Sequence, residues 1–142
     1  PNTDTGHRII VEKLKQFIQS HEDIAIMIPS MGQLRYLSAM KWVDAVVGNS
    51  SSGIIEAPGF GVGTINIGRR QDGRLKASSV LDCDATFESI NQAFMKLYSP
   101  AFQMTLRTVV NPYGTGGAAE KIISVLKNTE LHGLIVKKFY DQ

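Results

Sequence analysis

The sequence predicts an α/β protein with a Rossmann-like, three-layer parallel sheet. Short apolar, β-branched runs are typical of buried strands, and segments with helical periodicity alternate with them. The connections between these segments are short, which favours strands that run parallel with helices on both faces of the sheet. The clearest case is the apolar run at residues 44–47, which leads directly into a serine-rich turn and a helix.

Composition limits the classes of protein and partner. The chain has 142 residues, of which 43% are hydrophobic and 20% charged, as in an ordinary globular domain with one core. A net charge of +2 without a basic block argues against nucleic acid as a partner. No apolar run reaches the roughly 18 residues of a membrane span, so no membrane partner is expected. The single cysteine, Cys83, excludes an intramolecular disulfide framework and favours a reducing, cytoplasmic location.

The first part of the chain predicts a helix, a strand and a second helix. Residues 7–21 repeat apolar side chains at spacings of three and four, which predicts an amphipathic helix. Residues 24–28 are apolar and stop at Pro29, so we expect a short buried strand. A second helix begins at Gly32, and its expected core stripe consists of Leu34, Leu37, Met40 and Val43.

The middle of the chain predicts three more strands. The strand at residues 44–47 is followed by a helix that begins at Ser51 or Ser52 and ends or kinks at residues 58–61, which contain proline and glycine. Residues 64–67 form the next predicted strand, and residues 68–74 are a basic, glycine-flanked loop at its end. Residues 80–83 are the last expected strand.

The final part predicts helices and one irregular region. Residues 86–97 carry apolar side chains on one helical face, with Asp84 or Thr86 as the N-cap. Residues 98–117 are rich in glycine and proline, and we expect them to be irregular. Helices are expected at residues 118–128 and 131–140.

The serine-rich turn is a candidate anion site. A helix that begins there points unpaired N–H groups toward the end of the preceding strand, and serine hydroxyls add further donors. Glu56 falls about one turn later, where a carboxylate can accept hydrogen bonds from a pair of sugar hydroxyls. Ser50 and Arg70 both follow predicted strands, so both should face the crevice at the carboxyl ends of the strands. Many serine-rich turns, however, only cap a helix and bind nothing.

The motifs resemble those of the hydrolysing UDP-N-acetylglucosamine 2-epimerases, in particular the sialic-acid-pathway branch. The resemblance extends over essentially the whole chain. It rests on Gly48-Asn49-Ser50-Ser51-Ser52-Gly53-Ile54-Ile55-Glu56-Ala57-Pro58, the Gly61–Gly68 stretch, Arg70-Gln71-x-Gly73-Arg74, Gly32-Gln33-Leu34-Arg35-Tyr36-Leu37 and Asn111-Pro112-Tyr113-Gly114-x-Gly116.

The resemblance implies the carboxyl-terminal half of a GT-B fold, with residues 1–142 as a single nucleotide-binding domain truncated at its N-terminus. We expect the chain to begin after that domain's first two strands. The family reaction eliminates UDP from UDP-N-acetylglucosamine, and water then adds to the 2-acetamidoglucal to give N-acetylmannosamine. The catalytic acidic residues belong to the amino-terminal domain, so this chain alone should be inactive. No cofactor and no metal are implied.

The resemblance also assigns roles to residues. Ser50 and Ser51 match phosphate-binding serines, and Glu56 matches the glutamate that holds the ribose hydroxyls. Asn2 and Arg70 match positions on the nucleotide side of the cleft, and Gln33 lies in the segment that lines the base pocket. The sequence departs from the family pattern at Gly63, Arg69 and Thr115.

Two other functions remain open at this point. A UDP-sugar glycosyltransferase of the same fold would share the serine turn and the ribose glutamate. Alternatively, the chain is a nucleotide-binding module without catalysis. UDP or UDP-N-acetylglucosamine is the expected ligand in the leading interpretation, and the family pattern implies a homo-oligomer.

Overall fold

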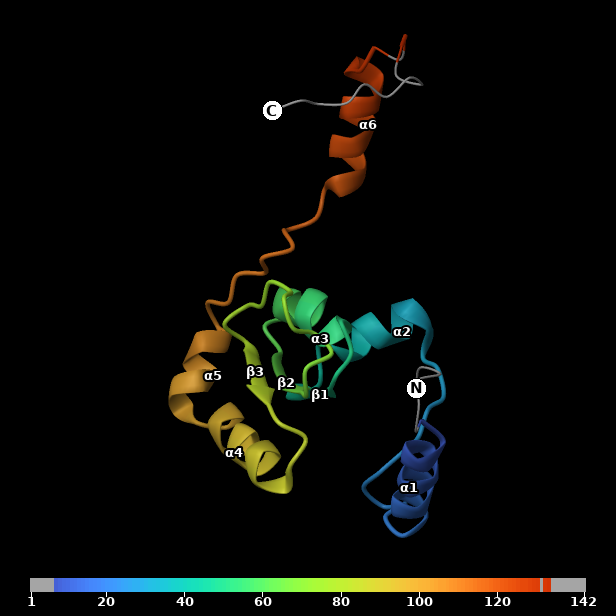
Figure 1. The fold of residues 1–142 in the computed structure, drawn as a ribbon, viewed down its shortest axis with the longest axis vertical. Helices are drawn as coiled ribbons and strands as arrows, with labels where there is room; N and C mark the ends of the chain where they lie inside the picture. The colour runs from blue at the N-terminus through green and yellow to red at the C-terminus, as the bar shows by residue number, and fades with distance from the viewer. Residues whose placement is uncertain (1–6, 131, 134–142) are drawn as a thin grey trace. The chain divides into compact units, whose positions relative to one another are not determined.

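The computed structural model describes residues 7–130 and 132–133, in two compact units, Pro1–Asp44 and Ala45–Gln142. The first unit contains α1 (His7–Gln19) and α2 (Gly32–Ala39), both labelled in Figure 1. These helices confirm the two that periodicity predicts in this part of the chain. Just after α1, the hydroxyl of Ser20 donates to the Gln16 carbonyl at 3.1 Å.

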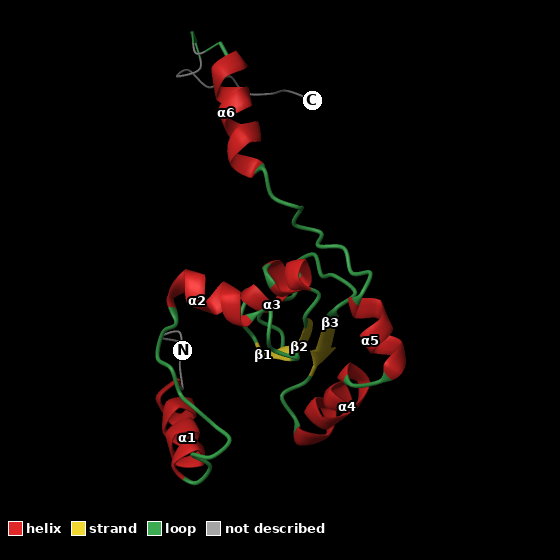
Figure 2. Ribbon diagram, turned by 180° about the vertical axis from the view of Figure 1, so that it is seen from behind, coloured by secondary structure: helices red, strands yellow, loops and turns green. Residues whose placement is uncertain are grey.

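The strand predicted at residues 24–28 is wrong. Figure 2 shows this segment as loop, and Ile24 and Ile26 are 75% and 82% exposed. An apolar run becomes a strand only when its backbone pairs with a neighbour, and among the described residues the sheet contains no strand from this unit. The predicted core stripe of the second helix is also wrong in part, because Met40 is buried while Leu34 and Val43 are exposed.

The second unit is built on a three-stranded parallel sheet. Its strands are β1 (Ala45–Gly48), β2 (Gly63–Ile67) and β3 (Val80–Cys83), in the order β1-β2-β3. Ala45 pairs with Gly63 and Thr64 pairs with Val80, so β2 is the central strand. The parallel sheet and all three strands that the sequence predicts after residue 43 are confirmed.

Helices cover both faces of this sheet, as Figure 1 shows. On one face lie α3 (Ser52–Ile55) and a 3₁₀ helix, η1 (Ala57–Phe60). On the other face lie α4 (Phe87–Leu97) and α5 (Pro100–Leu106). Side chains of β2 alternate between the faces: Thr64 contacts α3, whereas Ile65 is fully buried among the α4 and α5 side chains. The core around Ile65 consists of Leu81, Ala93, Leu97 and Phe102.

The N-caps of α4 and α5 bear on two sequence predictions, the cap of the helix at residues 86–97 and the irregular region at residues 98–117. Thr86 accepts a hydrogen bond from the Ser89 N–H, so of the two predicted candidates, Asp84 and Thr86, it is Thr86 that is the N-cap of α4. The irregular region predicted at residues 98–117 is wrong where it covers α5. Ser99 caps this helix and Pro100 occupies its first turn, an arrangement that starts helices as readily as proline ends them.

The last predicted helices have different outcomes. The helix at residues 118–128 is confirmed as α6 (Ala118–Asn128), whose apolar side chains are exposed. The helix predicted at residues 131–140 lies outside the described residues, except for a turn at residues 132–133.

Candidate functional site

The serine segment, residues 49–56, follows the carboxyl end of β1. Gly48 has a φ of 143°, which a residue with a side chain rarely adopts, and this lets the chain turn out of the strand. Ser51 is the N-cap of α3, but its side chain makes no capping hydrogen bond. The Ser50 hydroxyl accepts from the Ser52 N–H at 3.3 Å. Because α3 is a single turn, its dipole is weak, and the donors at this end are the local N–H and hydroxyl groups.

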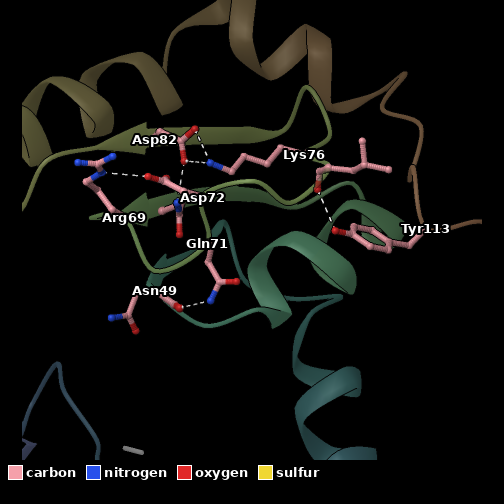
Figure 3. Close-up of polar contacts among 9 residues, drawn as sticks. Asn49, Arg69, Gln71, Asp72, Lys76, Asp82 and Tyr113 are labelled. Atoms are coloured by element: carbon pink, nitrogen blue, oxygen red, sulfur yellow. Dashed lines mark hydrogen bonds and ion pairs between the residues drawn. The ribbon is translucent and has the colours of Figure 1, made fainter. Parts of the chain in front are cut away.

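The loop after β2 contacts the start of the serine segment. Gly48 pairs with Asn66, so β1 and β2 end side by side. The Gln71 side chain donates from Nε2 to the Asn49 carbonyl at 2.7 Å, as Figure 3 shows. Arg70 reaches the same carbonyl through Nη1 at a longer 3.5 Å, and its side chain is exposed. The two loops expected to share a crevice therefore meet at Asn49.

Glu56 closes the other end of the serine segment. It is the C-cap residue of α3, and its N–H donates to the Ser52 carbonyl. Its carboxylate oxygen Oε2 is buried, and no other described residue gives it a hydrogen bond. A buried acceptor without a donor is unfavourable unless a ligand or water supplies one. This carboxylate therefore has free capacity to accept hydrogen bonds.

A distant segment supports the end of α3. Asn111 donates from Nδ2 to the Ile55 carbonyl at 2.9 Å, and its Oδ1 accepts from the Tyr113 N–H at 3.0 Å. The Tyr113 hydroxyl in turn donates to the Leu75 carbonyl at 3.1 Å (Figure 3). The segment around Pro112 thus connects α3 to the loop between β2 and β3.

A small ionic network lies farther along the sheet. Asp82 accepts from Asn66 at 2.7 Å and pairs with the Lys76 ammonium at 2.8 Å (Figure 3). Burial raises the pKa of Asp82, but the hydrogen bonds from Lys76 and Asn66 outweigh it, and the net pKa lies below the usual 3.8. Burial, with Asp84 and Asp82 nearby, raises the pKa of the neighbouring Cys83 thiol. The Asp82 carboxylate therefore already accepts hydrogen bonds from protein donors, whereas Oε2 of Glu56 accepts none from the described residues.

The remaining sequence-predicted site residues are Asn2 and Gln33. Asn2 lies outside the described residues. Gln33 belongs to the first unit, at the start of α2, and borders a hollow of about 460 Å³. The hollow is lined by Ile28, Pro29, Ser30, Met31, Gly32, Gln33 and Tyr36.

Two residues at the site were not singled out by sequence reasoning. Gln71 and Asn111 both lie inside motifs quoted above, but nothing local distinguishes their side chains from loop amides on the surface. For Gln71, the sequence offered one indication of a place at the site: it directly follows the candidate residue Arg70.

Residues 7–130 and 132–133 contain no group of three or more His, Cys, Asp or Glu side chains placed to hold a metal ion. None of the helices in these ranges combines the length and apolar character that crossing a membrane requires.

Comparison with known proteins identifies related sequences. The family model described as UDP-N-acetylglucosamine 2-epimerase matches residues 1–127. A GDP/UDP-N,N'-diacetylbacillosamine 2-epimerase (hydrolyzing) from Campylobacter jejuni is 40% identical over 99% of this chain and 36% of its own length. A UDP-N,N'-diacetylbacillosamine 2-epimerase (hydrolyzing) from Legionella pneumophila is 34% identical over 97% of the chain and 35% of its own length. The polysialic acid biosynthesis protein P7 of Escherichia coli is 33% identical over 99% of this chain and 36% of its own length. The chain thus spans little more than a third of these relatives.

Proposed function

Because this chain belongs to the UDP-N-acetylglucosamine 2-epimerase family, we propose that it is the nucleotide-binding part of a hydrolysing 2-epimerase. The proposed substrate is UDP-N-acetylglucosamine. The enzyme removes the C2 proton and expels UDP from C1, which gives 2-acetamidoglucal. Water then adds across the double bond, with hydroxyl to C1 and a proton to C2, and N-acetylmannosamine is released.

The observation that carries this proposal is the buried Oε2 of Glu56, which no described residue supplies with a donor. A ribose offers two adjacent hydroxyls, and one carboxylate can accept from both. Glu56 ends the serine segment, so a ribose held there leaves the attached diphosphate within reach of the segment's beginning. This arrangement supports a ribose clamp next to a phosphate site.

The beginning of the segment supports the phosphate part of the proposal. Ser50 and Ser51 supply hydroxyl and N–H donors, and the exposed Arg70 guanidinium lies beside Asn49. As the bond from C1 to the diphosphate breaks, negative charge grows on the diphosphate. Donors fixed in advance stabilise that charge more in the transition state than in the ground state, so they favour departure as well as binding.

Further contacts with the nucleotide are proposed for Gln33 and Asn2 of the first unit. Gln33 borders a hollow of about 460 Å³ in the first unit, and its amide can pair with the polar edge of uracil. Asn2 is proposed on the nucleotide side by its family position alone. The homo-oligomer and the cytoplasmic location also remain proposals.

A second candidate substrate is UDP-N,N'-diacetylbacillosamine. It is favoured by the names of two of the relatives above, those from Campylobacter and Legionella. Both sugars carry an acetamido group at C2 and UDP at C1, so the nucleotide site is the same for either. A glycosyltransferase reaction is disfavoured by the family membership.

The test is incubation of the native protein with each UDP-sugar in deuterium oxide, without an acceptor. We expect release of UDP, and a free sugar with inverted C2 that carries deuterium there. The sugar that is turned over identifies the substrate. A product that keeps its C2 proton, or transfer that requires an acceptor, would overturn the proposal. The 142-residue chain alone is expected to release no UDP, and turnover by it would contradict the placement of the catalytic groups elsewhere.

A further inference from the structure

The serine segment cannot define its own shape. Its helix, α3, has four residues, and the Ser51 side chain makes no capping bond. A single helical turn is not stable by itself, because the cost of nucleation exceeds the gain from so few hydrogen bonds. The positions of Ser50, Ser51 and Glu56 must therefore be set by contacts from other parts of the fold.

Gln71 supplies such a contact at the beginning of the segment. Its side chain is 3% exposed, and Nε2 donates to the Asn49 carbonyl at 2.7 Å. Its Oε1 is also buried and has no hydrogen-bond partner among the described residues. Burying an amide in this half-satisfied state is unfavourable, whereas an apolar side chain of similar length would not be. In Figure 3 the side chain of Gln71 points toward Asn49, which places the amide at the loop that precedes Ser50.

Asn111 supplies the matching contact at the end of the segment. Its Nδ2 donates to the Ile55 carbonyl at 2.9 Å, which fixes the peptide that leads into Glu56. The amide is itself held, because Oδ1 accepts from the Tyr113 N–H and the Tyr113 hydroxyl is anchored on Leu75. Asn111 is 56 residues from Ile55, so this contact is tertiary.

One side-chain amide thus donates to a backbone carbonyl at each end of the serine segment. We infer that Gln71 and Asn111 are positioning residues that hold the two ends of this nucleotide-binding segment. Gln71 sets the donors around Ser50 and Ser51 for the diphosphate, and Asn111 sets the Glu56 carboxylate for the ribose. The inference rests on the proposed function. It predicts that the two residues affect recognition of different parts of the same nucleotide.

The test measures the affinity of the native protein for UDP, UMP and 2′-deoxy-UDP by calorimetry. The variants are Gln71→Met, which keeps side-chain length without a donor, and Asn111→Asp, which keeps the acceptor for Tyr113. Gln103→Ala is the matched control, because the Gln103 amide also donates to a backbone carbonyl, that of Leu97 at 2.8 Å, but between α4 and α5. Thermal unfolding of each variant separates loss of folding from loss of recognition.

We expect Gln71→Met to reduce the preference for UDP over UMP by about fivefold, the equivalent of one hydrogen bond, with the preference for UDP over 2′-deoxy-UDP unchanged. Asn111→Asp should reduce the preference for UDP over 2′-deoxy-UDP and leave the preference for UDP over UMP unchanged. Gln103→Ala should change neither preference. Equal loss of affinity for all three nucleotides, or unchanged preferences in both variants, would overturn the inference while leaving the proposed function intact. If the unmodified protein prefers UDP over neither UMP nor 2′-deoxy-UDP, the proposed diphosphate and ribose sites are wrong, and the inference fails with them.

Discussion

The hydroxyl of Thr64, on the central strand, donates to the Gly53 carbonyl in α3 across 2.7 Å. Both residues are buried, and a Cβ built on Gly53 would lie 2.5 Å from the Thr64 methyl group Cγ2. The serine segment therefore packs on the sheet at van der Waals contact. The close approach requires glycine at position 53, and the hydrogen bond requires the hydroxyl of Thr64.

This contact predicts a steric clash that a second substitution relieves. Gly53→Ala should lower the free energy of unfolding by about 1–3 kcal/mol, because the new methyl group overlaps Thr64. Thr64→Ser removes Cγ2 but keeps the hydroxyl donor, so the double variant should recover much of this loss. Chemical denaturation of both single variants and the double variant measures the coupling. Additive losses would show that the clash is not the cause.

Glu56 should control recognition of the ribose. Glu56→Gln replaces a charged acceptor with one that has a single acceptor atom, so affinity for UDP should fall about tenfold. The preference for UDP over 2′-deoxy-UDP should fall as well. The control is Glu88→Gln, an exposed change in the first turn of α4 that should leave both values unchanged. Calorimetric titration gives both, and an unchanged preference in Glu56→Gln would argue against the ribose clamp.

Ser51 should control recognition of the diphosphate without affecting stability. Its side chain makes no capping hydrogen bond, so Ser51→Ala should leave the unfolding temperature nearly unchanged. Affinity for UDP should nevertheless fall about fivefold through the lost donor, more than affinity for UMP. Ser78→Ala, in an exposed turn, is the control. A drop in stability without a change in nucleotide preference would assign Ser51 a structural role instead.

Asp82 should make the stability of the second unit depend on acid pH. Its pKa in the folded chain is lowered, so its contribution is present above the ordinary pKa and is lost as pH falls through and below that value. The pair with Lys76 is partly exposed, so the contribution should not exceed about 1 kcal/mol. Asp82→Asn should be destabilising near neutral pH and nearly neutral once the pH is below the lowered pKa of Asp82.

Lys76→Met tests whether the ion pair with Asp82 causes this pH dependence of stability. Removal of the ammonium leaves Asn66 as the remaining donor to Asp82 and should weaken the same pH dependence. Unfolding by urea across the acid range compares the three proteins. A pH profile of Lys76→Met identical to that of the unmodified chain would contradict the role of the ion pair.

The sequence predicted those parts of the fold whose causes are local. The β1 strand is apolar over its whole length, and Gly48 and the following serines mark its end within a few residues. The α4 helix was predicted from the apolar side chains on one of its faces, and its N-cap, Thr86, was one of two nearby candidates. Ser50 and Glu56 were found as candidates for the same reason, since both belong to one short segment.

The errors and omissions have non-local causes. Residues 24–28 look like a strand in isolation, but strand formation depends on a partner that the local pattern does not reveal. Pro100 was treated as a break, although with Ser99 before it and Phe102 available for the core it begins a helix. The contacts from Gln71 to Asn49 and from Asn111 to Ile55 span 22 and 56 residues, and no spacing rule connects them.

The order of the strands also has a consequence for how the second unit folds. Each strand pairs with the next one along the chain, and paired residues are 18 and 16 positions apart. The entropy lost on closing such short loops is small, so parallel pairing, which is usually slow, can proceed quickly here. During synthesis the sheet can form in strand order as residues 45–83 leave the ribosome, before α4 and α5 cover its second face. The serine segment between β1 and β2 would then form early, and the contact from Asn111 to Ile55 would be added last.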